Sequence, residues 1–444
     1  MLKKLFFCFL FVFISLSVFA QKSDGFKFLN VNKRSDKINF KLVNNLIIIP
    51  INFNGVQLSF LLDSGVNKTL LLGVEVQDSS LISEYEKVKV IGLGKESQTY
   101  AYKTQDNSLQ IGEAVNNKAD VYLLLEEEFE LGSKIGVPVH GIIGYDFFKD
   151  FILRINYKQK TIKLYNPEKF KRKLSRYQKL PLQFHNNKAY LQVGVEDETI
   201  EKDYLNLLFD TGSGDSFWLF AKDEIIIPEE SFDDVIGYGI ASVIEGKRSL
   251  IQSIFIGDVK IVEPKVAYPN MQSIFGSQQI KFRDGSIGSE VLKRFKLFVD
   301  YPNRHIYFKP NSNLRDPFNY DMSGLLLKYA GYKVIEKKQD FSYSNEIEIN
   351  QDNILEKIGV KTEFLPILEV LNVRKNSPAD KADIRVGDVV LSIDKKSAYR
   401  YTIDDLQDLF SEKDGKIILL QISRDGKKLN RVIQLKNRLN RFKQ

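Results

Sequence analysis

The feature that most constrains the fold is an internal repeat that runs through much of the chain. The stretch SFLLDSGVNKTLLL around Asp63 returns as NLLFDTGSGDSFWLF around Asp210, 147 residues later. VIGLG at 90–94 returns as VIGYG at 235–239, LQIGE at 109–113 returns as IFIGD at 254–258, and GIIGYDFFKDF returns as GSIGSEVLKRF, with spacings of 144 or 145 residues. Four ordered matches with so little drift predict two copies of one domain, at residues 30–165 and 180–309.

Each copy has the residue pattern of a small β domain. NLIIIPINFNGVQLSFLLD alternates around Asn54-Gly55, a dipeptide suited to the positive φ angles of a two-residue hairpin turn, so Asp63 is expected to end the second strand. RINYKQKTIKLY and FVDYPNRHIYF predict one further hairpin in each copy. Between the copies, the polar, basic stretch NPEKFKRKLSRYQKLP predicts a surface linker.

The first twenty residues have the composition of an export signal. Lys3 and Lys4 precede an apolar run from Leu5 to Phe19, and VFAQ places small or aliphatic residues where a signal peptidase reads, which predicts cleavage after Ala20. The run is shorter than the roughly 20 residues that span a bilayer. We therefore expect an exported chain, in the periplasm, at the cell surface or secreted, without a membrane span after signal cleavage.

Composition predicts a globular chain that is stabilised by its cores. Hydrophobic residues make up 43% of the 444 residues, with 32 Phe and 20 Tyr, which is enough for packed interiors. The single cysteine, Cys8, lies in the signal segment, so the exported chain should contain no disulfide. Lys and Arg (64) are dispersed among Asp and Glu (57), so no nucleic-acid partner is expected. We expect a monomer.

The two repeated turns carry a resemblance to a known family. Two Asp-Ser/Thr-Gly turns, each followed by a glycine-bearing hairpin and an apolar-apolar-Gly segment, resemble the aspartic proteases of the pepsin and retropepsin type over roughly residues 40–310. The resemblance implies two retropepsin-like β-barrel lobes that bring Asp63 and Asp210 together around an attacking water. Two like charges about 4 Å apart repel by about 4 kcal/mol at an effective dielectric of 20. Such a pair shares one proton and needs no metal or organic cofactor.

Other residues of the repeat are assigned supporting roles. Glycines would let the two turns pack closely, and hydroxyls would orient the carboxylates; these residues are Ser64, Gly65, Thr211 and Gly212. The glycine-bearing hairpins are either flaps that close over a bound peptide or ordinary glycine turns. The flap and substrate-binding residues predicted are Gly92, Leu93, Gly94, Gly237, Tyr238 and Gly239.

Competing chemistries lack their motifs. The three histidines, His140, His185 and His305, occur singly, without HExxH or a cysteine partner, so no metal site is predicted and packing or surface roles are expected. There is no GxSxG elbow for a serine nucleophile. Trp218 follows the second turn in an apolar strand and is expected in the core.

The last part of the chain carries a different pattern. NSPADKADIRVGDVVLSIDKKSAYRYTIDDLQDLF, followed by GKIILLQISRDGKKLNRVIQL, resembles the PDZ domains of bacterial exported proteases. In that family a glycine-bearing loop offers N–H groups to a peptide's C-terminal carboxylate, and the peptide adds a strand to the sheet. The loop predicted here is Ser323, Gly324, Leu325 and Leu326, with a plain linker glycine at Gly324 as the alternative. Asp383 stands where the family often has glycine, and Asp tolerates the left-handed conformation.

These patterns predict a mainly β chain with five parts. They are a signal peptide (1–20), an N-terminal protease lobe (21–166), a linker (167–180), a C-terminal protease lobe (181–312) and a PDZ domain (315–440). The predicted function is an exported aspartic endopeptidase acting on a peptide or protein substrate, with a C-terminal peptide at the PDZ domain. A catalytically silent peptide-binding protein of the same fold is the first alternative, and a scaffold anchored through PDZ contacts is the second.

Overall fold

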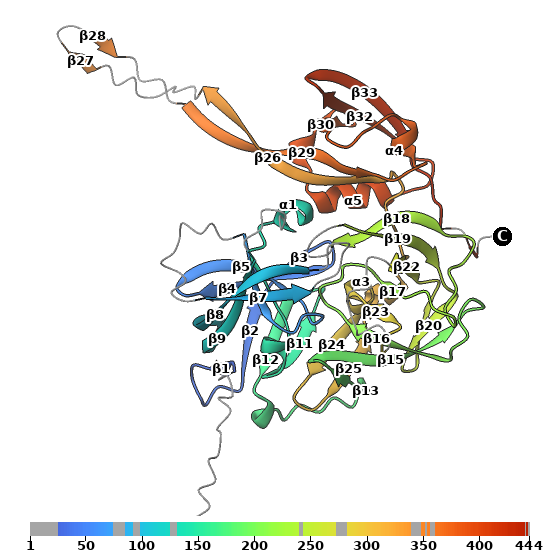
Figure 1. Cartoon of the computed structure of the whole chain (residues 1–444). Helices are drawn as coiled ribbons and strands as arrows, with labels where there is room; N and C mark the ends of the chain where they lie inside the picture. The colour runs from blue at the N-terminus through green and yellow to red at the C-terminus, as the bar shows by residue number, and fades with distance from the viewer. Residues whose placement is uncertain are drawn as a thin grey trace, which may run out of the picture.

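The computed structural model describes residues 25–73, 85–91, 98–124, 131–238, 243–271, 282–338, 348–350, 353–355, 360–439 and 441–442. The predicted signal peptide lies outside these residues. The described chain is mainly β, and its strands form two lobes and a third domain placed over them (Figure 1). No helix in the described ranges has the length and apolar character needed to cross a membrane.

The first lobe is built on a nine-stranded sheet with the order β1-β9-β6-β10-β5-β4-β8-β7, with β3 added beside β4. Asn54 and Gly55 have the predicted positive φ angles, 47° and 92°, in the turn that joins β4 to β5. Its strands are β1 (Lys27–Phe28), β3 (Lys41–Val43), β4 (Leu46–Phe53), β5 (Val56–Leu62), β6 (Thr69–Leu72), β7 (Glu86–Ile91), β8 (Gln98–Ile111), β9 (Ala114–Leu124) and β10 (Gly141–Ile143). The short helices α1 (Leu131–Ile135) and α2 (Tyr145–Phe148) flank β10 in the chain.

The second lobe repeats this topology. Its sheet has the order β18-β19-β22-β17-β23-β16-β15-β20-β21, with β14 beside β15. As β10 lies between β5 and β6 and runs parallel to β5, so β23 lies between β16 and β17 and runs parallel to β16. The elements are β14 (Gln183–His185), β15 (Lys188–Glu196), β16 (Tyr204–Phe209), β17 (Phe217–Leu219), β18 (Phe232–Tyr238), β19 (Val243–Leu250), β20 (Ser253–Ile256), β21 (Val259–Val262), β22 (Lys265–Pro269), β23 (Gly285–Ile287) and α3 (Ser289–Leu292).

A six-stranded sheet shared by both copies joins the lobes. Its order is β13-β25-β24-β11-β12-β2, and the two predicted hairpins, β11–β12 and β24–β25, meet where β11 pairs with β24. The segment predicted as a linker contributes its last residues to this sheet, because β13 begins at Gln178. The strands are β2 (Ser35–Asn39), β11 (Ile152–Asn156), β12 (Thr161–Tyr165), β13 (Gln178–Pro181), β24 (Phe295–Asp300) and β25 (His305–Pro310). One buried core runs through both lobes and this sheet.

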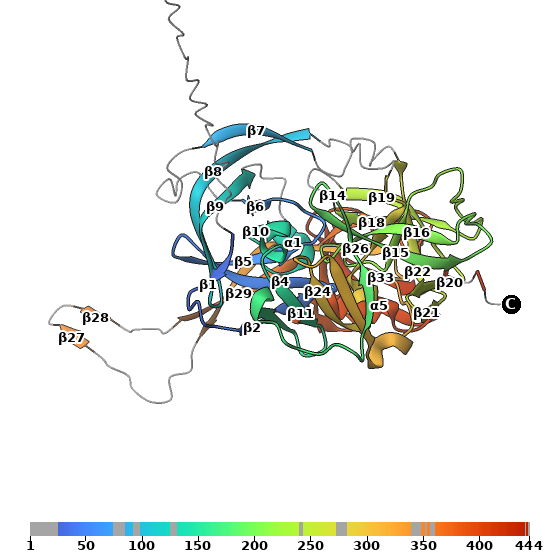
Figure 2. The same ribbon diagram turned by 90° about the horizontal axis from the view of Figure 1, so that it is seen from below.

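The third domain has a sheet of its own and packs against the second lobe. The sheet has the order β26-β29-β30-β32-β33, with β31 beside β30, and α5 faces the two lobes (Figures 1 and 2). Its core takes in Phe232 and Leu250 of the second lobe. The elements are β26 (Leu325–Lys338), β29 (Val360–Val373), β30 (Val389–Ile393), β31 (Lys396–Ser397), β32 (Ile417–Arg424), β33 (Lys427–Gln434), α4 (Pro378–Lys381) and α5 (Ile403–Ser411); the separate pair β27 (Glu348–Asn350) and β28 (Asn353–Leu355) lies within the β26–β29 connection.

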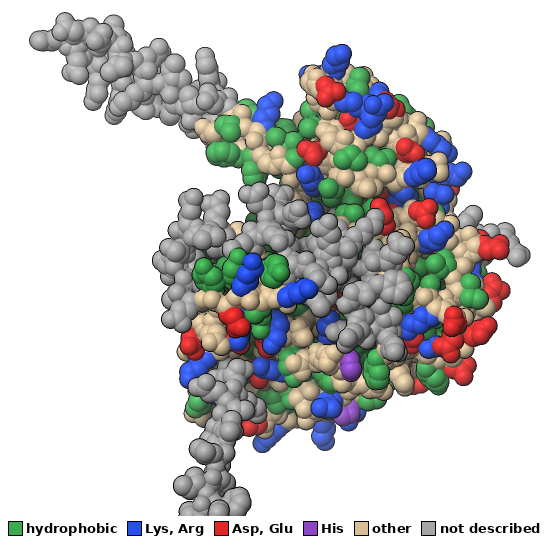
Figure 3. All heavy atoms as spheres, in the orientation of Figure 1, with side chains coloured by type: hydrophobic (Ala, Val, Ile, Leu, Met, Phe, Trp, Pro, Cys, Tyr) green, Lys and Arg blue, Asp and Glu red, His purple; other side chains and the backbone are tan. Residues whose placement is uncertain are grey.

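Charged side chains of both signs are interspersed on the face shown in Figure 3, over the lobes and over the third domain. Arg441 and Asp197 form a nearly inaccessible ion pair of 3.0 Å between the end of the chain and the second lobe. The third domain is therefore tied to the lobes by charge as well as by its core.

Candidate active site

The two aspartates follow equivalent strands of the two lobes. Asp63 comes directly after β5 and Asp210 directly after β16. The N–H of Asp63 donates to the carbonyl of Ile143 at 2.8 Å, and the N–H of Asp210 donates to the carbonyl of Ile287 at 3.1 Å. Each turn is therefore hydrogen-bonded to the apolar-apolar-Gly segment of its own lobe.

The hydroxyls of the turns lock the two lobes together. The N–H of Ser64 donates to Oγ1 of Thr211 at 3.0 Å, and the N–H of Thr211 donates to Oγ of Ser64 at 2.9 Å. Each hydroxyl then donates to a carbonyl of the opposite lobe, Ser64 to Phe209 at 2.7 Å and Thr211 to Leu62 at 2.8 Å. The hydrogen bonds of both hydroxyls go to the backbone and not to the carboxylates. They place the carboxylates by fixing the distance between the turns.

Glycine is required at the centre of this contact. A Cβ on Gly212 would lie 2.1 Å from Cγ of Asp63, and a Cβ on Gly65 would lie 3.1 Å from Oδ1 of Asp210. The glycine N–H groups also bind the carboxylates: Gly65 donates to Oδ1 of Asp63 at 2.7 Å, and Gly212 donates to Oδ1 of Asp210 at 3.1 Å. The structure thus brings Asp63, Ser64, Gly65, Asp210, Thr211 and Gly212 into one cluster.

The environment favours one shared proton on the carboxyl pair. Burial, followed by the repulsion of Asp210, raises the pKa of Asp63 to about 7. Burial also raises the pKa of Asp210, although the positive charges of Arg283 and Lys188 act in the opposite direction. A hydrogen bond between the two carboxyl groups contributes to the raised pKa of Asp63. A protonated acid and an ionised base can therefore coexist here near neutral pH.

A cavity of about 1690 Å³ contains the carboxyl pair. This volume exceeds the ~300–1,000 Å³ of ordinary small-molecule pockets, so it is large enough for an extended peptide. Both lobes and the third domain contribute to its walls, including Leu46, Asp63, Lys188, Asp210, Trp218, Gly237, Arg283, Gly324, Leu327, Ile403 and Phe410. Trp218 is 7% exposed and packs with Ile236, Ile244 and Ala267, so the predicted core residue also forms part of the wall.

The predicted flap hairpins are described in part. β7 pairs antiparallel with β8 in the first lobe, and β18 pairs antiparallel with β19 in the second. Gly237 lies in the cavity wall, where a Cβ would be 2.9 Å from the ring of Trp218. Tyr238 is the last residue of β18. The remaining predicted residues, Gly92, Leu93, Gly94 and Gly239, lie outside the described residues.

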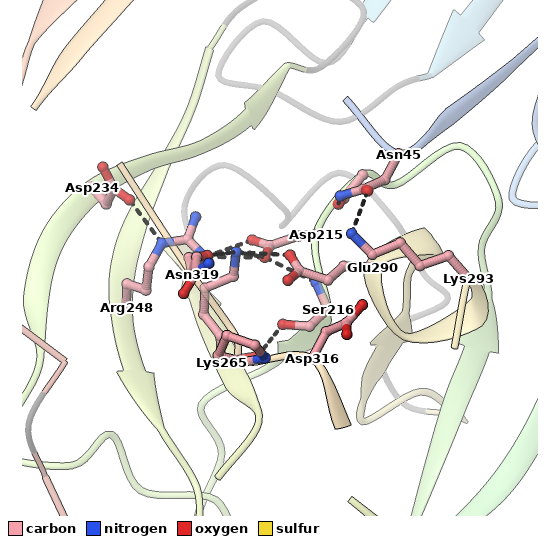
Figure 4. A network of polar contacts seen from close by, with 12 residues as sticks. Asn45, Asp215, Ser216, Asp234, Arg248, Lys265, Glu290, Lys293, Asp316 and Asn319 are labelled. Carbon is pink, nitrogen blue, oxygen red and sulfur yellow. Dashed lines mark hydrogen bonds and ion pairs between the residues drawn. The ribbon is translucent and has the colours of Figure 1, made fainter. Parts of the chain in front are cut away.

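A buried network of charges links the second turn to its flap strand (Figure 4). No motif in the sequence predicted this network. Arg248 lies between two carboxylates: Nη1 donates to Asp215 at 2.8 Å, and Nε donates to Asp234 of β18 at 2.8 Å. Lys265 binds Glu290 at 3.0 Å on the other side of Asp215. Asp215 lies three residues after Gly212 in the motif TGSGD, which is the one signal that could have pointed to this network.

The third domain continues this network to its predicted carboxylate loop. Arg374 donates from Nε to Asp234 at 2.9 Å and from Nη2 to the carbonyl of Asp321 at 2.8 Å. The carboxylate of Asp321 in turn accepts the N–H of Gly324 at 2.8 Å, and Oγ of Ser323 accepts the N–H of Leu325 at 3.0 Å. Two of the N–H donors expected to bind a peptide carboxylate, those of Gly324 and Leu325, are therefore engaged by the chain itself in this structure.

The groove between β26 and α5 opens toward the carboxyl pair. Leu325, Leu326 and Leu327 of β26 line the same cavity as Asp63 and Asp210, as do Ile403, Leu406 and Phe410 of α5. The first lobe closes one end of this groove. The N–H of Asn44 donates to Asp404 of α5 at 2.7 Å, and a Cβ on Gly136 would lie 2.8 Å from Ile403.

The histidines take part in packing where the structure shows their partners. Nδ1 of His140 accepts the N–H of Ser59 at 3.1 Å, and His185 stacks on Phe282. Within the described ranges, no group of three or more His, Cys, Asp or Glu side chains is placed to hold a metal ion.

Comparison with known proteins finds two family matches. Residues 49–147 match the model of an aspartyl protease family, and residues 369–424 match a PDZ domain model. The residues predicted as the carboxylate loop lie ahead of the second match. Among solved structures, an aspartic proteinase from Irpex lacteus is similar, with 13% identity and a TM-score of 0.41 over 64% of this chain and 99% of that chain. A search of curated proteins found no match.

Fold, site and matches together define the class. Residues 49–147, in the first lobe, match an aspartyl protease domain, and the second lobe repeats the topology of the first. A PDZ domain follows it toward the C-terminus.

Proposed function

We propose that the chain is an exported aspartic endopeptidase that uses Asp63 and Asp210 to activate water. The observation that carries this proposal is the interlocked carboxyl pair at the wall of a peptide-sized cavity. The turns of Ser64 and Thr211 fix the pair from both lobes. Such an arrangement is preorganised, since the two carboxyls need no rearrangement before they meet the substrate.

The proposed reaction follows from the shared proton. The ionised carboxylate accepts a proton from water as the water oxygen bonds to the scissile carbonyl carbon, while the protonated carboxyl donates its proton to the carbonyl oxygen. A neutral tetrahedral intermediate results. One carboxyl group then gives its proton to the amide nitrogen, while the other carboxylate takes a proton from a hydroxyl of the intermediate; the C–N bond breaks, and the amine and the carboxylic acid leave. The pair ends with one proton, as it began.

The position of the groove between β26 and α5 suggests how a long substrate would be held. Because the β26–α5 groove and the carboxyl pair share one cavity, a peptide strand added to β26 would continue toward Asp63 and Asp210. This arrangement favours a protein or long peptide as substrate, cleaved within the chain.

Substitution of either aspartate tests the proposal. Asp63→Asn and Asp210→Asn are nearly isosteric, and each removes a carboxyl that must accept or donate the shared proton. Cleavage of a denatured protein mixture should fall by about 10²- to 10⁴-fold, while peptide affinity changes far less. Asp258→Asn, at an exposed turn of the second lobe, is the control. A wild-type chain that binds peptides but cleaves none between about pH 3 and 8 would favour the silent peptide-binding protein.

A further inference from the structure

A lysine of the second lobe lies across from the second aspartate. β15 and β16 are antiparallel, and the pair nearest to the Asp210 turn is Tyr190 with Leu208. If this register is continued two residues beyond that pair, Lys188 comes opposite Asp210. Both residues line the same cavity, and their charges interact. Directly opposed residues of an antiparallel pair have Cβ atoms about 4.5–5.5 Å apart. The Cβ atom of Lys188 is therefore expected close to the carboxyl pair.

The first lobe has an apolar residue at the equivalent place. β4 and β5 pair Ile48 with Leu61, so the residue across from Asp63 is Leu46. Leu46 is 9% exposed and packs in the apolar cluster under the first turn. The lysine is therefore not required by the repeated fold, because the other copy builds the same turn without it.

The ammonium group of Lys188 has no partner among the residues that the structure describes. Its side chain is half-buried, it lines the cavity, and no described side chain or carbonyl forms a hydrogen bond or an ion pair with its Nζ. Burial, followed by the nearby charge of Arg283, lowers the pKa of Lys188. The positive charge is thus held in a costly environment, close to but not bonded to the carboxyl pair.

A second cation lies on the same side of the cavity. Arg283 is 7% exposed, its Nε donates to the carbonyl of Gly285 at 2.8 Å, and its guanidinium lies over the ring of Phe220. It also lines the cavity and interacts electrostatically with Asp210. Since β10 and β23 are equivalent, the counterpart of Arg283 in the first lobe is Val139, which is apolar.

The charges around the carboxyl pair indicate which kind of ligand group would fit beside it. With one proton shared, the carboxyl pair carries one negative charge, whereas Lys188 and Arg283 carry two positive charges. Among these four groups the cations therefore exceed the anions by one, and a buried ion is costly unless it is paired. A carboxylate on a ligand would balance it and would form charge-assisted hydrogen bonds with the free ammonium.

We propose that Lys188 and Arg283 form a subsite that binds a carboxylate of the substrate beside the scissile peptide bond. The preferred substrate is therefore an acidic peptide, and the carboxylate belongs to an Asp or Glu side chain or to a chain end near the cleaved bond. This subsite rests on the proposed endopeptidase function, since it names the substrate class of the same cavity.

The test uses peptide pairs that differ only in charge. The full exported chain is given peptides with Glu or Gln at each of the four positions on either side of the cleaved bond, each with a free and an amidated C-terminus. We expect Glu to be preferred over Gln at one position by about 10-fold in kcat/KM, and Lys188→Met to reduce that ratio to about 3 or less, since Arg283 remains. Lys188→Glu should favour Lys at that position.

The control is Lys68→Met. Lys68 lines the same cavity in the first lobe, over the ring of Tyr122, so this variant removes a positive charge without touching the subsite. It should keep the Glu/Gln ratio. A wild-type ratio within twofold of 1 at every position with both kinds of terminus, or an unchanged ratio in Lys188→Met, would overturn the proposal. A change only in the pH dependence of cleavage would show that Lys188 adjusts the carboxyl pair instead.

Binding separates this inference from the proposed function. The same Glu and Gln peptides, made with CH2–NH in place of the scissile CO–NH, cannot be cleaved, and their Kd values can be measured whether or not the chain is an enzyme. A Glu preference in binding without any cleavage would support the subsite and overturn the endopeptidase. Cleavage without a Glu or chain-end preference would overturn the subsite alone. A preference that depends on the free C-terminus would assign the carboxylate to the chain end.

Discussion

Replacing Asp63 by asparagine should stabilise the fold at pH 8 and change it little at pH 4. Burial, followed by the repulsion of Asp210, raises the pKa of Asp63 from 3.8 to about 7. A carboxyl whose pKa is higher in the folded than in the unfolded state lowers stability at every pH above its unfolded pKa, because the unfolded chain ionises more easily. The cost therefore grows between about pH 4 and pH 7 and stays constant above pH 7.

The stabilisation expected from Asp63→Asn follows from the difference between the folded and the unfolded pKa of Asp63. About three pH units at 1.36 kcal/mol each correspond to about 4 kcal/mol as an upper limit. Asp63 is half-buried and borders an open cavity, so solvent screens part of the penalty. We expect Asp63→Asn to raise the free energy of unfolding by about 2 kcal/mol at pH 8. The asparagine Oδ1 can still accept the N–H of Gly65.

Urea unfolding of wild type and Asp63→Asn at pH 4, 6 and 8 measures this difference. Asp284→Asn is a control of opposite sign. Burial opposes ionisation of Asp284, but the N–H of Asn206 and the ammonium of Lys202 outweigh it and hold the pKa of Asp284 below its usual range. Asp284→Asn should therefore destabilise the chain at pH 8 and lose this effect as the pH falls. An Asp63→Asn variant no more stable than wild type at pH 8, or a difference that does not vary with pH, would refute the reasoning.

Three further predictions follow from the same structure. The kcat/KM of cleavage should fall on the alkaline side near pH 7, where the pair around Asp63 loses its shared proton; a flat profile from pH 5 to 9 would contradict this. Asp321→Ala should free the N–H of Gly324 and tighten binding of peptides with a free C-terminus by about 10-fold, with no gain for amidated peptides. Arg441→Met should lower the free energy of unfolding by about 3 kcal/mol, since it removes the buried counter-ion of Asp197 and leaves that carboxylate only its hydrogen bonds to Thr199 and Gln252. Lys260→Met removes an exposed ion pair and should cost less than about 1 kcal/mol; equal effects of these two variants would contradict the reasoning.

Sequence predicted the repeated architecture well because duplication leaves a periodic record. Two copies of an Asp-small-Gly turn, each with its apolar-apolar-Gly segment, are visible at a constant spacing, and their strands then have equivalent partners in both lobes. Local turn chemistry was also predictable. Asn54 and Gly55 have positive φ, and Asp383 adopts a φ of 53° where a glycine would be usual.

The contacts between segments that are distant in the sequence could not be predicted in the same way. Ser64 and Thr211 were correctly placed in their turns, but their hydrogen bonds cross to the opposite lobe, and nothing local specifies which atom a hydroxyl meets there. Arg374 and Asp234 are 140 residues apart and have no motif in common. A buried ion pair is chosen by the packing of whole domains, so its partners appear only when the PDZ domain is seen against the second lobe.

Duplication also explains where to look for specificity. The two lobes agree at Asp63 and Asp210, where each turn supports the other and where the proposed reaction needs both carboxyls. Around the pair they need not agree, and the residues opposite the two aspartates are Leu46 in one lobe and Lys188 in the other. A side chain that the repeated fold does not require, that carries a charge in a half-buried place and that has no partner in the described chain is best explained by a group supplied from outside. The departures from the repeat therefore indicate the substrate, as its agreements indicate the reaction.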